Sequence, residues 1–209
     1  MQLQIALDTF NTQEAVNLIN SINSVIDIAE IGTPMLLNYG NIPVKTISEK
    51  FKGLTVLADS KIMDAGEIES ANLFAAGARI VTVMGVTHDE TVKGAVKAAK
   101  KYGRKIMADM MCVDNIERRA CKLVSLGVDY ICVHSAVDVQ KFENPFISLE
   151  RLVNTIDRKH CAIAGGVNLQ NIGEVIKYKP EIVIVGNGIT GANNKILAAE
   201  AIRKEIKKV

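Results

Sequence analysis

The segment Leu54-Thr55-Val56-Leu57-Ala58-Asp59-Ser60-Lys61-Ile62-Met63-Asp64 begins as an apolar β-strand and ends in charged residues. On a strand, Asp59 and Lys61 are two positions apart and therefore point to the same side. Asp64 follows where the strand should give way to a loop, so two carboxylates flank one ammonium group. Charged groups in a confined site must be paired or bound to something. The segment therefore predicts a strand that carries a site for a metal ion and a developing anion.

Short β-branched runs alternate with helical patterns along the whole chain. Strands this apolar are buried on both faces, which requires a parallel sheet covered by helices. Several helical patterns end at a glycine, at Gly77, Gly103 and Gly127, where a left-handed cap is wanted. The expected strands are 3–8, 25–31, 54–61, 80–85, 105–110, 130–134, 162–167 and 182–186, and the helices between them include 12–22, 67–76, 90–102, 116–126, 149–156, 169–178 and 194–206.

Eight such units in 209 residues predict an α/β protein with one domain, a (β/α)8 TIM barrel over residues 1–209. The segment Asp8-Thr9-Phe10-Asn11 follows the first strand, where a dinucleotide-binding fold would carry Gly-x-Gly-x-x-Gly. This difference argues against an open doubly wound sheet.

The composition excludes several classes of partner. The net charge is +2, and the basic segments lack the interleaved aromatic residues of a nucleic-acid surface. No apolar stretch approaches the roughly 20 residues that span a bilayer, and only Met1 precedes the first expected strand. The four cysteines include no Cys-x-x-Cys pair, so neither a zinc site nor a redox motif is indicated. We expect a cytoplasmic protein that binds neither nucleic acid nor membranes.

Charged residues stand at the carboxyl ends of the expected strands. In a barrel these ends converge on one mouth, where the active site of this architecture lies. A single aspartate after a strand is as often a helix N-cap as a catalyst, but several converging positions are not explained by capping. The residues are Asp8, Glu30, Asp59, Lys61, Asp109 and His134.

Glycines follow the last two strands. Gly165 and Gly166 come after the seventh strand, before a helix expected to open near Asn168, and Gly186 and Asn187 come after the eighth. Glycines let the backbone approach an anion, and these two loops are the usual phosphate grip of barrels. The alternative is that the glycines serve only tight turns.

Taken together, these motifs resemble the orotidine monophosphate decarboxylase superfamily. They are Leu7-Asp8, Glu30-Ile31-Gly32-Thr33-Pro34, Asp59-x-Lys61-x-x-Asp64-x-Gly66-x-x-Glu69, Asp109-Met110, His134-x-x-x-Asp138-x-Gln140 and Ala164-Gly165-Gly166-Val167. Within the superfamily the chain is most similar to aldehyde-lyases that join formaldehyde to D-ribulose 5-phosphate. The resemblance implies that reaction, through a Mg²⁺-stabilised enediolate to D-arabino-hex-3-ulose 6-phosphate. It also implies a homodimer in which Asp64 completes the neighbour's site.

The residue types suit this chemistry. Glu30 and Asp59 are hard oxygen ligands for Mg²⁺, and Lys61, held protonated by Asp59 and Asp64, adds a fixed positive charge beside the oxyanion. His134 is the candidate for moving the C1 proton and protonating the new alkoxide. Three alternatives remain open: Glu30 pairs with Lys61, His134 is a satisfied buried histidine, or Asp8 and Asp109 organise the cluster instead of contacting substrate hydroxyls.

The rival reaction is decarboxylation of 3-keto-L-gulonate 6-phosphate by a sister family. Those decarboxylases typically carry an arginine three residues after the histidine, and here that position is Val137. Ala136 and Asn187 depart from the aldolase pattern and could signal a shifted substrate preference. A catalytically silent sugar-phosphate-binding barrel is the remaining alternative, and the intact Asp59, Lys61, Asp64 and His134 argue against it.

Overall fold

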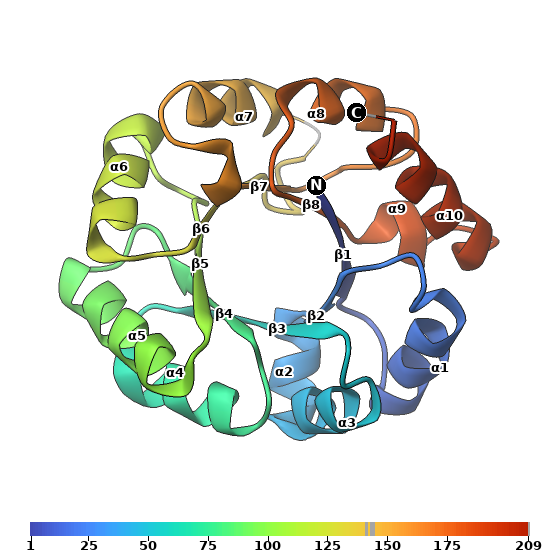
Figure 1. Cartoon of the computed structure of the whole chain (residues 1–209), viewed down its shortest axis with the longest axis horizontal. Helices are drawn as coiled ribbons and strands as arrows, with labels where there is room; N and C mark the ends of the chain where they lie inside the picture. Colours follow the sequence, from blue (N-terminus) through green and yellow to red (C-terminus); the bar gives the residue numbers. More distant parts are fainter. Residues whose placement is uncertain (141, 143–144, 209) are drawn as a thin grey trace.

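Eight parallel strands close into a barrel in the computed structural model, which describes residues 1–140, 142 and 145–208. Each strand pairs with its neighbours in the sequence, and β1 pairs with β8 to close the ring (Figure 1). The fold is therefore the (β/α)8 TIM barrel that the alternating pattern predicts. The strands are β1 (Gln2–Leu7), β2 (Ile28–Ile31), β3 (Thr55–Ile62), β4 (Ile80–Met84), β5 (Lys105–Asp109), β6 (Tyr130–His134), β7 (Cys161–Ala164) and β8 (Ile182–Val185).

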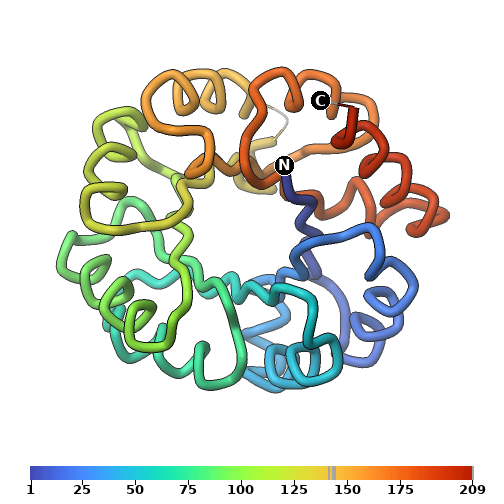
Figure 2. The backbone as a smooth tube through the Cα atoms, in the orientation of Figure 1, coloured from blue at the N-terminus to red at the C-terminus, as the bar shows by residue number. Residues whose placement is uncertain are grey.

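The helices form an outer ring, and the chain travels once around the barrel axis from the N-terminus to the C-terminus (Figure 2). They are α1 (Thr12–Ile22), α2 (Thr33–Tyr39), α3 (Ile42–Lys50), α4 (Gly66–Ala75), α5 (Asp89–Tyr102), α6 (Ile116–Leu126), α7 (Pro145–Val153), η1 (Arg158–His160), α8 (Ile172–Tyr178), α9 (Asn187–Thr190) and α10 (Lys195–Ile206). Among the described residues, none of these helices is long and apolar enough to cross a membrane.

Local signals fix most helix ends. Asn11 forms a capping box with Glu14, in which the Asn11 side chain accepts from the Glu14 N–H and the Glu14 carboxylate accepts from the Asn11 N–H. Gly103 and Gly127 end α5 and α6 in the left-handed conformation, as expected for C-caps. The helix expected over 169–178 starts later than the pattern indicates, because α8 begins at Ile172 and residues 168–171 form a turn.

Two apolar layers surround the strands. The larger one lies between the strands and the helices, and the smaller one fills the barrel interior. The interior layer contains Ala6, Ile28, Leu57, Ile80, Met107, Tyr130, Cys132, Ala162, Ala164, Ile182 and Ile184. Because side chains alternate along a strand, the next inward position after Ala6 is Asp8, after Ile28 is Glu30, and after Leu57 is Asp59. The inward rows thus change from apolar to charged at the carboxyl-terminal mouth.

Strand β3 bulges at the point where its charged residues begin. Ala58 pairs with Val81 and Ile62 pairs with Val83, so the register between β3 and β4 shifts across this interval. Lys61, within the bulge, has a φ of 47°, which a residue with a side chain adopts only at some cost in conformational energy. The bulge therefore redirects the end of β3 at the mouth of the barrel.

Candidate active site

Three charged side chains and one histidine, from three strands, form one connected chain at the mouth. Lys61 Nζ lies 2.7 Å from Asp59 Oδ2 and 3.3 Å from Asp109 Oδ2. The same Asp109 oxygen lies 2.7 Å from His134 Nδ1. Asp59 and Asp109 are buried, whereas the side chains of Lys61 and His134 keep 26% and 19% exposure and so remain accessible to a ligand. The structure thus connects the predicted lysine and the predicted histidine through one carboxylate.

The charges in this cluster stabilise one another. Burial alone would lower the pKa of Lys61, but the negative charges of Asp59 and Asp109 outweigh it and hold that pKa above its usual value. Burial alone would raise the pKa of Asp109, but the hydrogen bond from His134, together with the charges of His134 and Lys61, outweighs it and leaves the pKa below its usual value. Lys61 is therefore held as a cation and Asp109 as an anion.

Asp64 does not occupy the place expected beside Lys61 within the chain. It is exposed in the loop after β3, and its Oδ1 accepts a hydrogen bond from the N–H of Ala65 at 2.7 Å. Asp109, which lies 48 residues from Lys61 in the sequence, is the second carboxylate that flanks the ammonium group. The expectation that Asp59 and Asp64 of one chain flank Lys61 is therefore wrong. Within one chain Asp59 and Asp109 flank the ammonium group, because Asp64 lies in the exposed loop after β3.

Glu30 and Asp8 lie in a region with excess negative charge. Burial and then the charge of Asp59 raise the pKa of Glu30 well above its usual value. The same two causes, in the same order, raise the pKa of Asp8. Glu30 Oε2 accepts a hydrogen bond from Gln4 Nε2 at 2.6 Å, and the ion pairs of Lys61 are with Asp59 and Asp109. The structure thus argues against the alternative in which Glu30 is the ion-pair partner of Lys61.

A hard divalent cation fits this donor set. Four carboxylates, from Asp8, Glu30, Asp59 and Asp109, face one lysine and one histidine, and two of them have raised pKa values because of burial and mutual repulsion. A Mg²⁺ ion, which takes carboxylate oxygens and completes its shell with water or substrate oxygens, would relieve that repulsion. Within the described residues, no three His, Cys, Asp or Glu side chains form a metal cluster by themselves.

Neutral residues hold the charged ones; Thr33 and Gly32 belong to the motif that begins at Glu30, whereas the sequence patterns did not single out Thr82. Thr33 Oγ1 donates to the carbonyl oxygen of Asp59 at 2.7 Å and lies 3.0 Å from its Oδ2. Thr82 Oγ1 donates to Asp59 Oδ1 at 2.8 Å. Gly32 leaves space for the carboxylate of Asp8, which a Cβ at position 32 would strike. A threonine inside a β-branched run looks like any strand residue, so the sequence offered no signal for Thr82.

The two glycine loops lie against each other. A Cβ at Gly188 would come within 2.6 Å of the carbonyl oxygen of Val167, so the loop after β8 contacts the loop after β7. Gly165 and Gly166 have φ values of 94° and 72°, and the carbonyl of Gly166 accepts bonds from the side chains of Asn168 and Asn171. Gly186 is close to Asp8, because a Cβ there would lie 3.8 Å from Asp8 Oδ2. Of the residues predicted to grip phosphate, Gly186 thus borders the charged cluster, and Gly165 lies against Ser135, the residue after His134.

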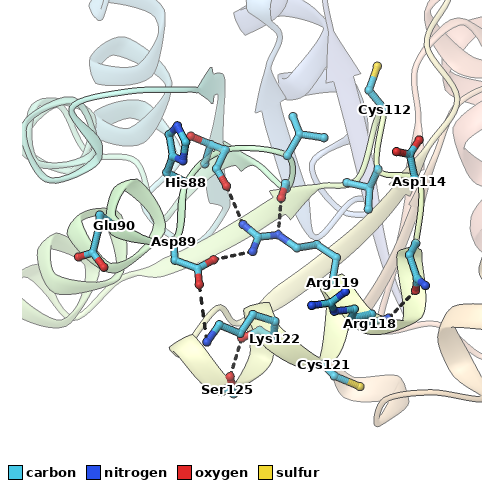
Figure 3. Close-up of a pocket in the computed structure, with 15 residues that line it drawn as sticks. His88, Asp89, Glu90, Cys112, Asp114, Arg118, Arg119, Cys121, Lys122 and Ser125 are labelled. Atoms are coloured by element: carbon cyan, nitrogen blue, oxygen red, sulfur yellow. Dashed lines mark hydrogen bonds and ion pairs between the residues drawn. The ribbon is translucent and has the colours of Figure 1, made fainter.

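A separate groove of about 1130 Å³ is lined by the loops after β4 and β5, the first turn of α5 and the length of α6 (Figure 3). Arg119 lines this groove. Its guanidinium group donates to the carbonyl oxygens of Gly85 and Thr87 and forms an ion pair with Asp89. His88 borders this groove and His160 bonds to the carbonyl of Asp129, so neither belongs to the charged cluster. Since no predicted site residue lines the groove, the candidate active site is the mouth of the barrel.

Comparison with known proteins identifies the class. Residues 1–202 match the family described as "Orotidine 5'-phosphate decarboxylase / HUMPS family". The chain belongs to this family, as the sequence motifs indicated, and it is an enzyme of the lyase class.

Individual relatives are more specific. The chain is 48% identical over 207 residues, 99% of both chains, to the 3-hexulose-6-phosphate synthase of Bacillus subtilis (strain 168). The crystal structure of 3-hexulose-6-phosphate synthase from Salmonella typhimurium superimposes with a TM-score of 0.96 at 37% identity, covering 100% of this chain and 99% of that one. The 3-keto-L-gulonate-6-phosphate decarboxylase of Vibrio cholerae superimposes with a TM-score of 0.86 at 25% identity, covering 99% of this chain and 97% of that one.

Proposed function

We propose that this enzyme condenses formaldehyde with D-ribulose 5-phosphate to give D-arabino-hex-3-ulose 6-phosphate. The observation that carries the proposal is the connected chain of Asp59, Lys61, Asp109 and His134 at the barrel mouth. In this chain one buried carboxylate, that of Asp109, contacts both Lys61 and His134, which we propose as the fixed cation and the proton carrier. Names of relatives support the same reaction, since the B. subtilis and S. typhimurium proteins are 3-hexulose-6-phosphate synthases.

His134 is suited to move the proton that the reaction requires. With the proton on Nδ1 donated to Asp109, its other ring nitrogen carries a lone pair and can take a proton from C1 of ribulose 5-phosphate. The resulting enediolate forms a bond from C1 to the formaldehyde carbon, and the electron pair of the C=O bond moves to oxygen. The protonated histidine then returns its proton to this alkoxide, so the histidine ends as it began.

Lys61 stabilises the negative charge that develops on the substrate oxygen during these steps. Because Asp59 and Asp109 hold the ammonium group in place, it needs little reorganisation when that charge appears. Glu30 and Asp59 are the residues that would hold Mg²⁺, which when bound supplies Lewis-acid polarisation of the substrate carbonyl. The backbone near Gly165, Gly166, Gly186 and Asn187 would hold the phosphate.

The decarboxylase alternative is disfavoured at Val137. This residue is 80% exposed in the loop after β6, where a neutral side chain cannot deliver a proton. Because the V. cholerae decarboxylase shares this barrel, the fold alone does not choose between the two reactions, and the choice depends on residues of this kind. A silent binding barrel would not need Lys61 and His134 joined through one carboxylate.

The direct test follows loss of formaldehyde in the presence of D-ribulose 5-phosphate and Mg²⁺. We expect turnover that EDTA abolishes and that Mg²⁺ or Mn²⁺ restores, because both proposed ligands are carboxylates. Thermal melting supplies a second readout: Mg²⁺ should raise the melting temperature of the wild type. Undiminished turnover after exhaustive chelation would overturn the metal-assisted mechanism, and no formaldehyde loss would overturn the proposed reaction.

A further inference from the structure

The bulge in β3 sets three residues against a single residue of β4. Ala58 is opposite Val81 and Ile62 is opposite Val83, so the interval that contains Asp59, Ser60 and Lys61 faces Thr82 alone. A regular ladder would give each of these residues its own neighbour. At a bulge the ladder is interrupted, and the polar groups of the extra residues need other partners.

Thr82 supplies a partner to each of the three. Its hydroxyl donates to Asp59 Oδ1 at 2.8 Å and accepts the backbone N–H of Lys61 at 2.9 Å. Its carbonyl oxygen accepts the hydroxyl of Ser60 at 3.0 Å. Thr82 is itself buried, with 4% of its surface exposed, so water does not compete for these bonds. One hydroxyl thus joins the carboxylate of Asp59 to the backbone of Lys61.

We propose that Thr82 is a positioning residue that fixes Asp59 and Lys61 relative to each other. Lys61 has the left-handed backbone that directs its ammonium group back to Asp59, and the bond from its N–H to Thr82 holds that conformation. Thr33 Oγ1, which donates to the carbonyl oxygen of Asp59, also lies 3.0 Å from the other carboxylate oxygen, so both threonine hydroxyls contact the Asp59 carboxylate. The expected effect on kcat rests on the proposed function, whereas the expected effect on the position of Lys61 does not.

The test compares Thr82→Val with Thr82→Ser. Valine keeps the shape and removes the hydroxyl, whereas serine keeps the hydroxyl. We expect Thr82→Val to lower kcat by about 10- to 100-fold, because small misplacement of catalytic groups has effects of that size. KM for ribulose 5-phosphate should change little, since the phosphate loops are elsewhere, and Thr82→Ser should recover most of kcat. The matched control is Thr55→Val at the other end of β3, which should leave kcat unchanged.

A second readout does not depend on the reaction. At one fixed pH, the rate at which an amine reagent labels Lys61 is measured by mass spectrometry relative to the exposed Lys97. Thr82→Val should make Lys61 several-fold more reactive, because the ammonium group loses its fixed partner, and Thr82→Ser should not. If Thr82→Val does not fold, Thr82→Cys, which offers only a weak donor, takes its place in both measurements.

Two outcomes overturn the inference: wild-type kcat and wild-type labelling in the variant without the hydroxyl, or failure of serine to restore either readout. If the wild type does not consume formaldehyde, the proposed function fails, and the labelling of Lys61 still decides whether Thr82 positions it. The two failures are therefore distinguishable.

Discussion

Glu30 is a single residue of the candidate active site whose charge lowers the stability of the folded protein. Its carboxylate is buried, and both burial and the charge of Asp59 raise its pKa, so its charged form destabilises the folded protein. The neighbouring Gln4 is also buried and its Oε1 has no hydrogen-bond partner in the structure. An amide at position 30 would remove the charge and could donate to that oxygen.

We therefore expect Glu30→Gln to abolish formaldehyde condensation and to raise the melting temperature in metal-free buffer. Partnering a buried polar atom contributes about 1–3 kcal/mol, and about 1 kcal/mol corresponds to roughly 2–4 °C in a domain of this size. The pKa of Glu30 is raised in the folded protein, so the folded state binds this proton more tightly than the unfolded state does. The stability that the bound proton contributes to the wild type is therefore lost as the pH rises through the folded-state pKa. The advantage of the variant should consequently grow from pH 5 to pH 8.

Exposed Glu200 offers the control, since Glu200→Gln should change neither stability nor activity. Mg²⁺ should stabilise the wild type and not Glu30→Gln. A variant that melts below the wild type at pH 8 in EDTA would contradict this account of Glu30.

Val137 is the residue at which we expect the choice of reaction to lie. Because its side chain is 80% exposed, arginine can replace it without disturbing the core. Val137→Arg should raise decarboxylation of 3-keto-L-gulonate 6-phosphate by about tenfold or more, since a positioned proton donor contributes roughly 10²–10⁴-fold. Carbon dioxide release measures this activity, and Val137→Leu is the neutral control. A wild type that prefers decarboxylation to condensation would reverse our ordering of the two reactions.

At the scale of elements, the loop after β7 depends on one glycine. Gly165 has a φ of 94°, and a Cβ there would come within 2.5 Å of the carbonyl oxygen of Ser135. Gly165→Ala should therefore displace the loop, destabilise the fold by about 1–3 kcal/mol and raise KM for the sugar phosphate. Gly173 in α8 is the matched control, because no atom lies within 4 Å of its Cβ position. Gly173→Ala should stabilise the protein by about 0.5–1 kcal/mol. Urea unfolding measures the free energy of unfolding of both variants, and equal changes in Gly165→Ala and Gly173→Ala would contradict the argument.

Sequence patterns predicted the elements where the period was clear and failed where it was weak. All eight strands were predicted, because each is a compact apolar run bounded by polar residues. Helices α2 and α3 were not predicted. They are short, are joined through Gly40 and Asn41, and α2 has Met35 as its buried residue, so the helical period is hard to see. The four-residue α9 was expected to be a loop for the same reason.

The candidate site was predictable only in part. Charged residues at strand ends could be found because charge in an apolar context is conspicuous. Their pairing could not, since the contact between Lys61 on β3 and Asp109 on β5 joins two strands separated by β4 and residues 48 positions apart in the sequence. The neutral partner Thr82 carries no such signal, and its role depends on a bulge that only the three-dimensional register shows.

At the scale of the whole molecule, large exposed apolar side chains occur in several units of the barrel, and five of them belong to consecutive segments from α2 to the loop after β4. Leu37, Ile42, Met63, Ile68 and Val86 are 82%, 65%, 53%, 66% and 43% exposed, and they belong to α2, α3, the loop after β3, α4 and the loop after β4. Large exposed apolar groups that gather on one side of a protein are typical of association surfaces. The five residues are consistent with the homodimer that the family resemblance implies, and we propose that its interface passes beside the loop that contains Asp64.

Exposure of Asp64 leads to the final prediction, that each active site takes Lys61 from one chain and Asp64 from the other. Lys61→Ala and Asp64→Ala should each be nearly inactive, yet chains mixed during refolding should recover activity. Random pairing makes half of the dimers mixed, and each holds one intact site of two, so formaldehyde consumption should reach roughly a quarter of the wild-type value. Mixing wild type with the double variant separates the hypotheses again: shared sites predict roughly a quarter of full activity, and sites within one chain predict roughly half. If mass spectrometry shows mixed dimers and no activity returns, Asp64 acts within its own chain.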